Sequence, residues 1–230
     1  MSSPSVALYG HWICPFVSRV QFALGQRGVS YTLVNVPPTA ARPKGFVVPE
    51  PFLAHSPKGE VPLLQIDEDY LADSLPILWW MEERLSEPSL LPSDTDGIEQ
   101  VRERMAWINH TIFPPMIGVY YGVETSRIAA ASSALSAALY EMSQWLEHDD
   151  WLTGSAPSLS EAALVSLYVR LDGLRALGFD ARLPRQVEAH RQRCQDLPGW
   201  SHVAWSQENL EEYVGRFTLF RERARERSSD

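Results

Sequence analysis

The pattern of apolar and polar residues differs between the first part of the chain and the remainder. In the first part, short apolar runs typical of strands alternate with helical stretches, beginning with a run at 6–9. A helical pattern starts at Cys14-Pro15, where proline suits the first helical position because its missing N–H would have no intrahelical partner. This helix is predicted to stop at Gly28. Further elements are predicted in this order: a strand at 31–34, a proline-rich loop at 37–51, strands at 61–66 and 70–71, and a helix at 73–85.

Every element predicted after residue 96 is a helix. Residues 88–96 are rich in Ser, Pro, Asp and Thr, and no strand pattern follows them. Ser158 and Glu161 form a capping box before a helix with few charges in its first half, which predicts a central position for that helix. The predicted helices lie at 98–123 (interrupted by Pro114-Pro115), 127–148, 161–177, 184–196 and 206–226.

These two kinds of sequence predict two domains. An α/β domain with the order βαβ–ββα is expected over 1–87, a linker over 88–96, and an all-helical domain over 97–230. A chain of 230 residues is long enough for each domain to bury a core of its own.

Composition narrows the classes of partner. The formal net charge is −9 and no basic stripe is present, so nucleic acid is not an expected partner. No apolar run approaches the ~18 residues of a membrane span, and the first ten residues lack the pattern of a secretory signal. The two cysteines, Cys14 and Cys194, are far apart and form neither a disulfide framework nor a metal-ligand cluster. We therefore expect a cytoplasmic protein without a bound metal.

Cys14 carries the clearest candidate chemistry. It falls at the N-cap of the first predicted helix, where free backbone N–H groups and the positive end of the helix dipole meet. Thiols in such positions have lowered pKa values and act as nucleophiles at neutral pH. Free cysteine is also among the most buried residue types. From spacing alone, a reactive thiol and a buried apolar residue are both open interpretations of Cys14.

The order of elements and four local motifs resemble the cytosolic glutathione S-transferase superfamily over nearly the whole chain. That resemblance implies a thioredoxin-like N-terminal domain followed by an all-α C-terminal domain. The start ICPFVSR, with Arg19 three residues after the CPF motif, is most similar to the cysteine-type, omega-like members. The four motifs are Cys14-Pro15-Phe16, Gly59-Glu60-Val61-Pro62-Leu63, Asp73-Ser74, and Trp151-Leu152-Thr153-Gly154 ahead of the capping box.

The resemblance implies glutathione as co-substrate. In the family, the residue at Val61 pairs its backbone with the cysteinyl amide of glutathione, and the Val61-Pro62 bond is cis. Asp73-Ser74 resembles the pair that holds the γ-glutamyl carboxylate at a helix N-terminus, although an ordinary N-cap explains it equally. Lys58 matches a basic position near the glycyl carboxylate, or is an exposed turn lysine. The implied glutathione-binding residues are Cys14, Phe16, Lys58, Val61, Pro62, Asp73 and Ser74.

A cysteine-type site implies a monothiol cycle. The third residue after Cys14 is Val17, so no resolving cysteine stands in a C-x-x-C motif, and Cys194 is interpreted as core. A mixed disulfide between Cys14 and glutathione then indicates thiol transferase, deglutathionylation or dehydroascorbate reductase activity. Two alternatives stay open. One is a glutathione-dependent dehalogenase, isomerase or ether-cleaving enzyme, and the other is a binding protein that keeps the fold without the chemistry.

A small second substrate, aromatic or not, is expected in a cleft between the two predicted domains. An aromatic stripe at helical spacing is also typical of plain core, so this assignment competes with a structural one. The resemblance further implies a homodimer. The candidate second-substrate residues are His11, Trp12, Ile13, Trp107, His110, Phe113 and Tyr120.

Overall fold

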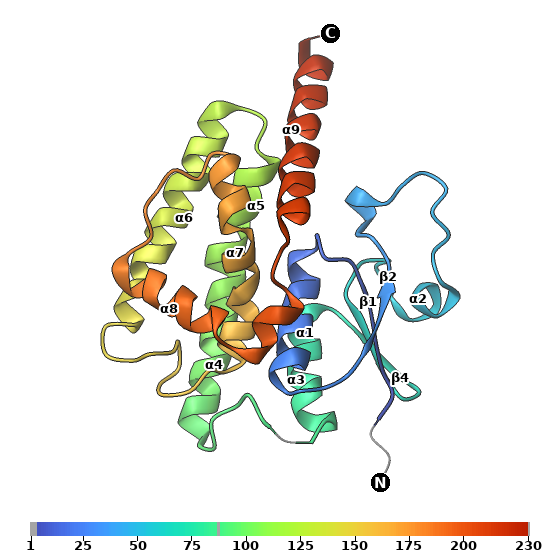
Figure 1. Ribbon diagram of the computed structural model, residues 1–230, viewed down its shortest axis with the longest axis vertical. Helices are drawn as coiled ribbons and strands as arrows, with labels where there is room; N and C mark the ends of the chain where they lie inside the picture. The colour runs from blue at the N-terminus through green and yellow to red at the C-terminus, as the bar shows by residue number, and fades with distance from the viewer. Residues whose placement is uncertain (1–3, 87, 230) are drawn as a thin grey trace. The chain divides into compact units, whose positions relative to one another are not determined.

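The computed structural model describes residues 4–86 and 88–229, and these fall into two compact units (Figure 1). The first unit runs up to Pro92 and also contains Leu197–Val203, and the second consists of Ser93–Asp196 and the residues from Ala204 onward. The predicted helical domain over 97–230 included residues 197–203. In the structure this short segment belongs to the first unit, where it packs on α1. A contact between segments so far apart in the chain cannot be predicted from a local sequence pattern.

The first unit is built on a mixed four-stranded sheet in the order β2-β1-β3-β4. The strands β1 (Val6–Gly10) and β2 (Thr32–Asn35) are parallel, while β3 (Leu63–Ile66) runs antiparallel to both β1 and β4 (Asp69–Ala72). All four strands lie within about two residues of their predicted positions. The mixed sheet with its helices confirms the predicted thioredoxin-like arrangement.

Three α-helices accompany this sheet, and one of them was missed. Helix α1 (Pro15–Gln26) begins directly after Cys14, as predicted, and α3 (Ser74–Arg84) follows Asp73. The predicted loop at 37–51 contains a 3₁₀ turn at Thr39–Ala41 and the start of α2 (Glu50–His55). Helix α2 has only six residues, too few to show a helical period, and the complete burial of Phe52 holds it in place.

The segment from the far end of the chain packs tightly on α1. A Cβ atom on Gly199, in the 3₁₀ turn Pro198–His202, would lie 2.4 Å from the backbone oxygen of Phe22. A Cβ atom on Gly25 of α1 would lie 2.4 Å from the ring of His202. Glycine is therefore required on both sides of this contact. Helix α1 packs on this turn and on α3, and nearly all its residues are buried.

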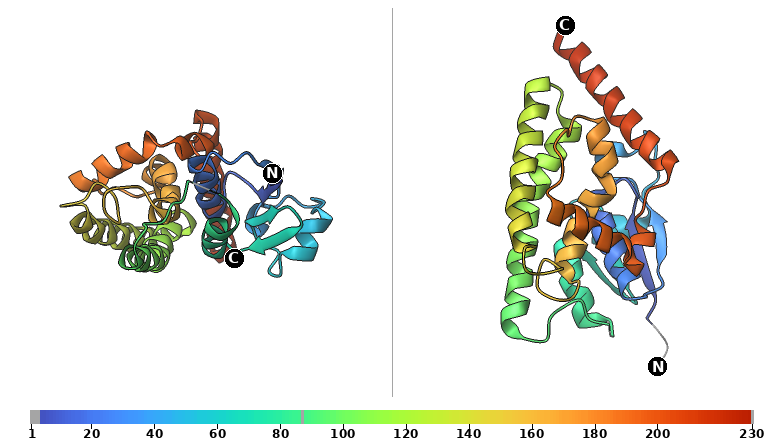
Figure 2. Two further views of the ribbon diagram at one scale, coloured as in Figure 1. Left: turned by 90° about the horizontal axis from the view of Figure 1, so that it is seen from below. Right: turned by 60° about the vertical axis from the view of Figure 1, so that its left-hand side comes forward.

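All the elements described in the second unit are helices, as predicted, and α7 lies at its centre (Figure 2). Helix α7 (Leu159–Ala176) contacts α4, α5, α8 and α9, and almost every one of its residues is buried. The capping box of Ser158 and Glu161 is present at its start. The other helices are α4 (Thr95–Trp107), α5 (Phe113–Tyr121), α6 (Thr125–Trp145), α8 (Arg185–Gln195) and α9 (Gln207–Ser229).

The interruption predicted at Pro114-Pro115 begins slightly earlier in the chain. A π-helical turn occupies Ile108–Ile112, and the N–H of Phe113 donates to the carbonyl of Ile108. Both prolines lie in the first turn of α5, where a missing N–H is tolerated. The wider π turn lets the chain pass from α4 into α5 without a loop.

Candidate functional site

Cys14 lies where α1 begins, beside the turn that precedes β3. Its backbone is extended, with φ −79° and ψ 121°, and its N–H donates to the carbonyl of His11 at 3.0 Å. The buried thiol Sγ is 3.8 Å from the carbonyl oxygen of Val61, to which the protonated form donates a weak hydrogen bond. A thiolate at this position would lose that bond and would face the positive end of the helix dipole.

The loop before Cys14 contains His11, Trp12 and Ile13, and the ring of His11 turns toward the backbone of this loop. The N–H of Ile13 donates to Nδ1 of His11 at 3.2 Å, so this nitrogen acts as an acceptor and the ring proton is on Nε2. The rings of His11 and Trp12 lie 5.5 Å apart between centroids. Two of the candidate second-substrate residues therefore contact each other in the same loop as the thiol.

A cavity of about 470 Å³ opens within the first unit next to this loop. It is lined by the start of α1, the turn at 56–62, the end of β4 and the start of α3. Five of the seven predicted glutathione residues line it, namely Phe16, Lys58, Val61, Pro62 and Asp73. Sequence reasoning missed Ser56, Pro57, Glu60, Leu71, Ala72 and Pro76, although all of them adjoin the predicted motifs. Cys14 and Ser74, the remaining two predicted residues, are buried immediately beside lining residues.

The two motifs that line the cavity are joined through their backbones. The Val61-Pro62 peptide bond is cis, as the resemblance predicted, and the N–H of Asp73 donates to the carbonyl of Pro62 at 3.3 Å. Asp73 has a φ of 79°, a region that non-glycine residues rarely adopt, and its side chain makes no capping hydrogen bond. Asp73 therefore occupies the N-cap position of α3, but its side chain does not cap the helix. Its exposed carboxylate instead faces Lys58 at 3.8 Å.

Ser74, the first residue of α3, is bound by a buried arginine from α1. Arg19 has no exposed surface, and its Nη1 donates to Oγ of Ser74 at 3.3 Å. The guanidinium also lies 5.2 Å from the centroid of the Phe16 ring. A positive charge is thus placed between the first turns of α1 and α3.

The proline-rich loop supports one wall of the cavity. Arg42 donates to the carbonyls of Pro37 and Gly59, and the backbone N–H of Thr39 lies 3.4 Å from a carboxylate oxygen of Glu60. Within the wall itself, Oγ of Ser56 donates to the carbonyl of Glu60 at 2.9 Å. These contacts fix the turn at 56–60 and give the long loop a supporting role.

The candidate second-substrate residues of the helical unit have partners inside that unit. Trp107 donates Nε1–H to Glu141 at 2.9 Å and packs edge-on against Trp145. His110 is exposed, and its Nδ1 donates to the carbonyl of Ala106 at 2.7 Å. Phe113 and Tyr120 are buried, and the Tyr120 ring contacts Tyr213 and Phe217. Core packing accounts for the contacts of Phe113 and Tyr120. The second-substrate role of all four residues stays a prediction.

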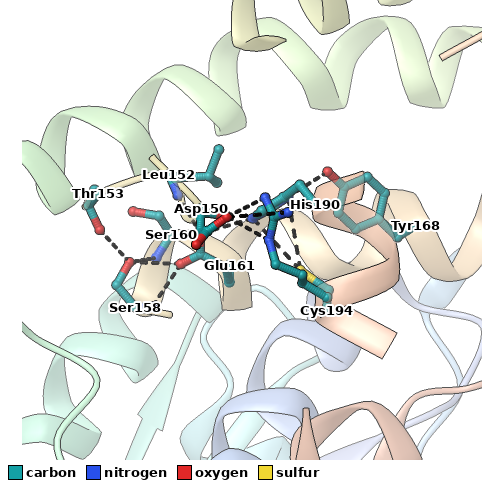
Figure 3. Close-up of polar contacts among 10 residues, drawn as sticks. Asp150, Leu152, Thr153, Ser158, Ser160, Glu161, Tyr168, His190 and Cys194 are labelled. Carbon is teal, nitrogen blue, oxygen red and sulfur yellow. Dashed lines mark hydrogen bonds and ion pairs between the residues drawn. The ribbon is translucent and has the colours of Figure 1, made fainter. Parts of the chain in front are cut away.

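A buried polar cluster surrounds the capping box in the second unit (Figure 3). Glu161 accepts hydrogen bonds from the N–H groups of Leu152 and Ser158 at 2.8 and 2.7 Å, and from Nε2 of His190 at 3.2 Å. The other ring nitrogen of His190 is 2.8 Å from the hydroxyl of Tyr168. No residue of this cluster was predicted as part of a functional site.

The second cysteine belongs to this cluster. Sγ of Cys194 is 3.8 Å from Nε2 of His190, and the residue is buried. Burial, reinforced by the negative charge of Glu161, raises the pKa of the Cys194 thiol well above its usual value. The interpretation of Cys194 as a core residue is confirmed, and its thiol is held protonated.

The structure also bears on metal binding and on insertion into a membrane. Within residues 4–86 and 88–229, no three His, Cys, Asp or Glu side chains are grouped so that they could hold a metal ion. In that same part of the chain, no helix has the length and apolar character needed to cross a membrane.

Fold and site together define a two-unit protein with a thioredoxin-like domain, a thiol at a helix start and an adjacent cavity. Residues 8–89 match the family model described as glutathione S-transferase, N-terminal domain. Residues 8–89 therefore belong to the family of glutathione S-transferase N-terminal domains.

Solved structures share the fold of this chain, and curated relatives are similar to part of its sequence. The chain is similar to rice glutathione S-transferase 1 in complex with glutathione (TM-score 0.82, 15% identity, 97% of this chain and 99% of that one). It is 33% identical over 107 residues to maleylpyruvate isomerase of Ralstonia sp (46% of this chain, 49% of that protein). It is 36% identical over 98 residues to maleylacetoacetate isomerase of Pseudomonas aeruginosa (42% and 44%). The chain thus spans about half the length of these curated relatives.

Proposed function

We propose that the cavity of the first unit binds glutathione and that Cys14 exchanges disulfides with it. The observation that carries this proposal is the 3.8 Å approach of the Cys14 sulfur to the Val61 carbonyl. Val61 lines the cavity. The resemblance implies that its backbone pairs with the bound tripeptide. The thiol therefore stands beside the position that the sulfur of glutathione would occupy.

The reaction is a monothiol cycle. The Cys14 thiolate attacks the glutathionyl sulfur of a mixed disulfide, forms a Cys14–glutathione disulfide and releases the substrate thiolate. A second glutathione thiolate attacks the glutathionyl sulfur, which frees Cys14 and leaves oxidised glutathione. Cys194 takes no part, because its raised pKa keeps it protonated. The cycle needs a reduced glutathione pool, consistent with the cytoplasmic location that we expect.

Intact-mass spectrometry after incubation with oxidised glutathione tests this proposal. We expect one glutathionyl group on the native protein, none on Cys14→Ser, and an unchanged adduct on Cys194→Ala. Reduced glutathione should remove the adduct. An adduct that persists in Cys14→Ser, or no adduct on the native protein, would overturn the thiol-exchange proposal.

A second candidate function is glutathione-dependent isomerisation. It is favoured by the maleylpyruvate and maleylacetoacetate isomerases to which the chain is similar. In such a reaction, the thiolate of glutathione adds to a carbon–carbon double bond and the resulting single bond rotates. Elimination of the same thiolate then restores the double bond. No disulfide is formed, so Cys14 would position the thiol of glutathione rather than attack it.

The same variant distinguishes the two functions. Isomerisation of maleylpyruvate, followed by its absorbance, should survive in Cys14→Ala if glutathione supplies the nucleophile. Thiol transfer from a glutathionylated peptide should be lost in that variant. Native protein that isomerises maleylpyruvate and fails to deglutathionylate peptides would assign the second function in place of the first.

A homodimer is also proposed on the family assignment. Exposed apolar side chains of the first unit offer a surface for such an interface, notably Val47 (87% exposed) and Leu53 (62% exposed).

A further inference from the structure

A buried cation lies next to the cavity that we propose for glutathione. Arg19 is on α1, five residues after Cys14, and is fully buried. A guanidinium is costly to remove from water unless its surroundings compensate for the lost hydration. The guanidinium carbon of Arg19 lies 5.2 Å from the centroid of the Phe16 ring, and Phe16 lines the cavity. This position indicates that the buried charge has a role in the cavity.

The hydrogen bond from Arg19 decides whether the hydroxyl of Ser74 acts as a donor or an acceptor. A guanidinium has N–H donors and no acceptor, so Oγ of Ser74 can only accept in the 3.3 Å contact with Nη1. The one hydroxyl proton of Ser74 is then left to donate to another acceptor. Ser74 is the first residue of α3, where the N–H groups of the first turn have no intrahelical acceptors and the dipole favours an anion.

Without Arg19, the charged residues on the cavity wall would repel an anionic ligand. The charged residues that line the cavity in the described structure are Lys58, Glu60 and Asp73, so acidic groups outnumber basic ones. The carboxylate of Asp73 adjoins Ser74 in the chain and would repel a ligand carboxylate at the start of α3. A buried positive charge beneath Ser74 offsets that repulsion, and it is screened little by solvent because it is buried.

We propose that Arg19 is a positioning residue that makes the α3 end of the cavity selective for a carboxylate. It does so by holding Ser74 as a hydrogen-bond donor and by balancing the charge of Asp73. The inference rests on the proposed function, in which this carboxylate is the α-carboxylate of the γ-glutamyl residue. Arg19 itself touches no ligand and acts through Ser74.

The test compares two ligands that differ only in that carboxylate. The probes are S-methylglutathione and its analogue in which 4-aminobutyrate replaces the γ-glutamyl residue, both unable to form a disulfide with Cys14. Their dissociation constants are measured by titration calorimetry with the native protein, Arg19→Met, Arg19→Lys and Ser74→Ala. The ratio of the two constants reports recognition of the carboxylate alone, so a general loss of structure leaves this ratio unchanged.

We expect the native protein to prefer the carboxylate-bearing ligand by about 10- to 100-fold, the effect of a hydrogen bond to a charged group. Arg19→Met and Ser74→Ala should each reduce this preference to less than about threefold, and combining them should reduce it no further. Arg19→Lys, which keeps the charge, should retain part of the preference.

Arg27 provides a matched control. It is a second buried arginine at the other end of α1, and it binds Glu82 and the carbonyls of Leu85 and Ser86, away from the cavity. Arg27→Met should lower thermal stability and leave the preference intact. If Arg19→Met weakens both ligands equally, Arg19 has only a structural role and the inference fails. If the native protein binds both ligands equally well, the inference about Arg19 is wrong but the proposed glutathione site stands. If it binds neither ligand, both the inference and the proposed glutathione site are wrong.

Discussion

At the scale of single residues, the molecule separates its two thiols by their environments. Cys14 lies beside a cavity at the start of a helix, whereas Cys194 is enclosed by Tyr168, His190 and Glu161. We propose that the same functional group serves chemistry in one unit, whereas in the other it is part of the core. Reactivity follows from what surrounds the sulfur, since the thiolate is the reacting form.

The Cys194 thiol is expected to stay unreactive across the alkaline range. Its folded-state pKa is raised, so in Cys14→Ala we expect almost no labelling by iodoacetamide between pH 7 and 9, and labelling of one thiol in urea. Because the folded state holds this proton more tightly than the unfolded state, stability should also fall as pH rises above the ~8.5 of a free thiol. Fast labelling of native Cys14→Ala would contradict the burial of this thiol.

The Glu161 carboxylate is expected to be the costliest polar group to remove from the helical unit. Glu161→Ala leaves His190 and the N–H groups of Leu152 and Ser158 without their buried acceptor. We expect a loss of about 3–5 kcal/mol in the free energy of unfolding, measured by urea denaturation. Glu212→Ala, which breaks the half-exposed pair with Arg216, should cost less than about 1 kcal/mol. A cost for Glu161→Ala no larger than that of the control would be inconsistent with the cluster.

At the scale of elements, the site depends on contacts between segments that are distant in the chain. The turn at 56–60 is supported by the loop at 37–51, and α1 is covered by the turn at Pro198–His202. Each of these contacts fixes a backbone, and the helix that follows Cys14 packs on this turn and on α3. A rigid element positions a reactive group better than a loop does.

A methyl group added between α1 and this turn should loosen the first unit. In Gly199→Ala the new Cβ would lie 2.4 Å from a backbone oxygen, which cannot move aside like a flexible side chain. We expect a loss of about 1–3 kcal/mol, seen as a lower melting temperature. Gly215→Ala in α9 meets no atom within 4 Å and should instead be neutral or stabilise by up to about 1 kcal/mol. Equal melting temperatures for the two variants would argue against tight packing at Gly199.

At the scale of the whole molecule, the family assignment predicts a dimer. Light scattering should give a mass twice the 26.0 kDa of one chain. Val47→Asp with Leu53→Asp would place charges on the exposed apolar side chains of the segment between β2 and β3 and should yield the mass of a single chain. Tyr140→Ser, at an exposed position of α6, serves as the control and should remain dimeric. A single-chain mass for the native protein would exclude the homodimer.

Much of the fold followed from local pattern because local interactions decide it. Pro15 fixes the start of α1, the Ser158–Glu161 capping box fixes the start of α7, and apolar spacing gives the long helices. Helix α2 was not predicted because its six residues form less than two helical turns, too few to show a helical period. The turn at Pro198–His202 was predicted to lie in the helical domain. Its contact with α1 could not be predicted because the two segments are more than 170 residues apart in the chain.

The candidate site was predictable only as a set of motifs. By itself, the sequence determined the helix start at Cys14, the Val61-Pro62 and Asp73-Ser74 motifs and the all-helical second part, since each depends on neighbouring residues. Tertiary structure alone decided that Glu60 and Pro76 line the same cavity as Phe16 and that Arg19 donates to Ser74. The physical reason is that burial and hydrogen-bond partners arise from segments that meet only after folding, and these set what each side chain can do.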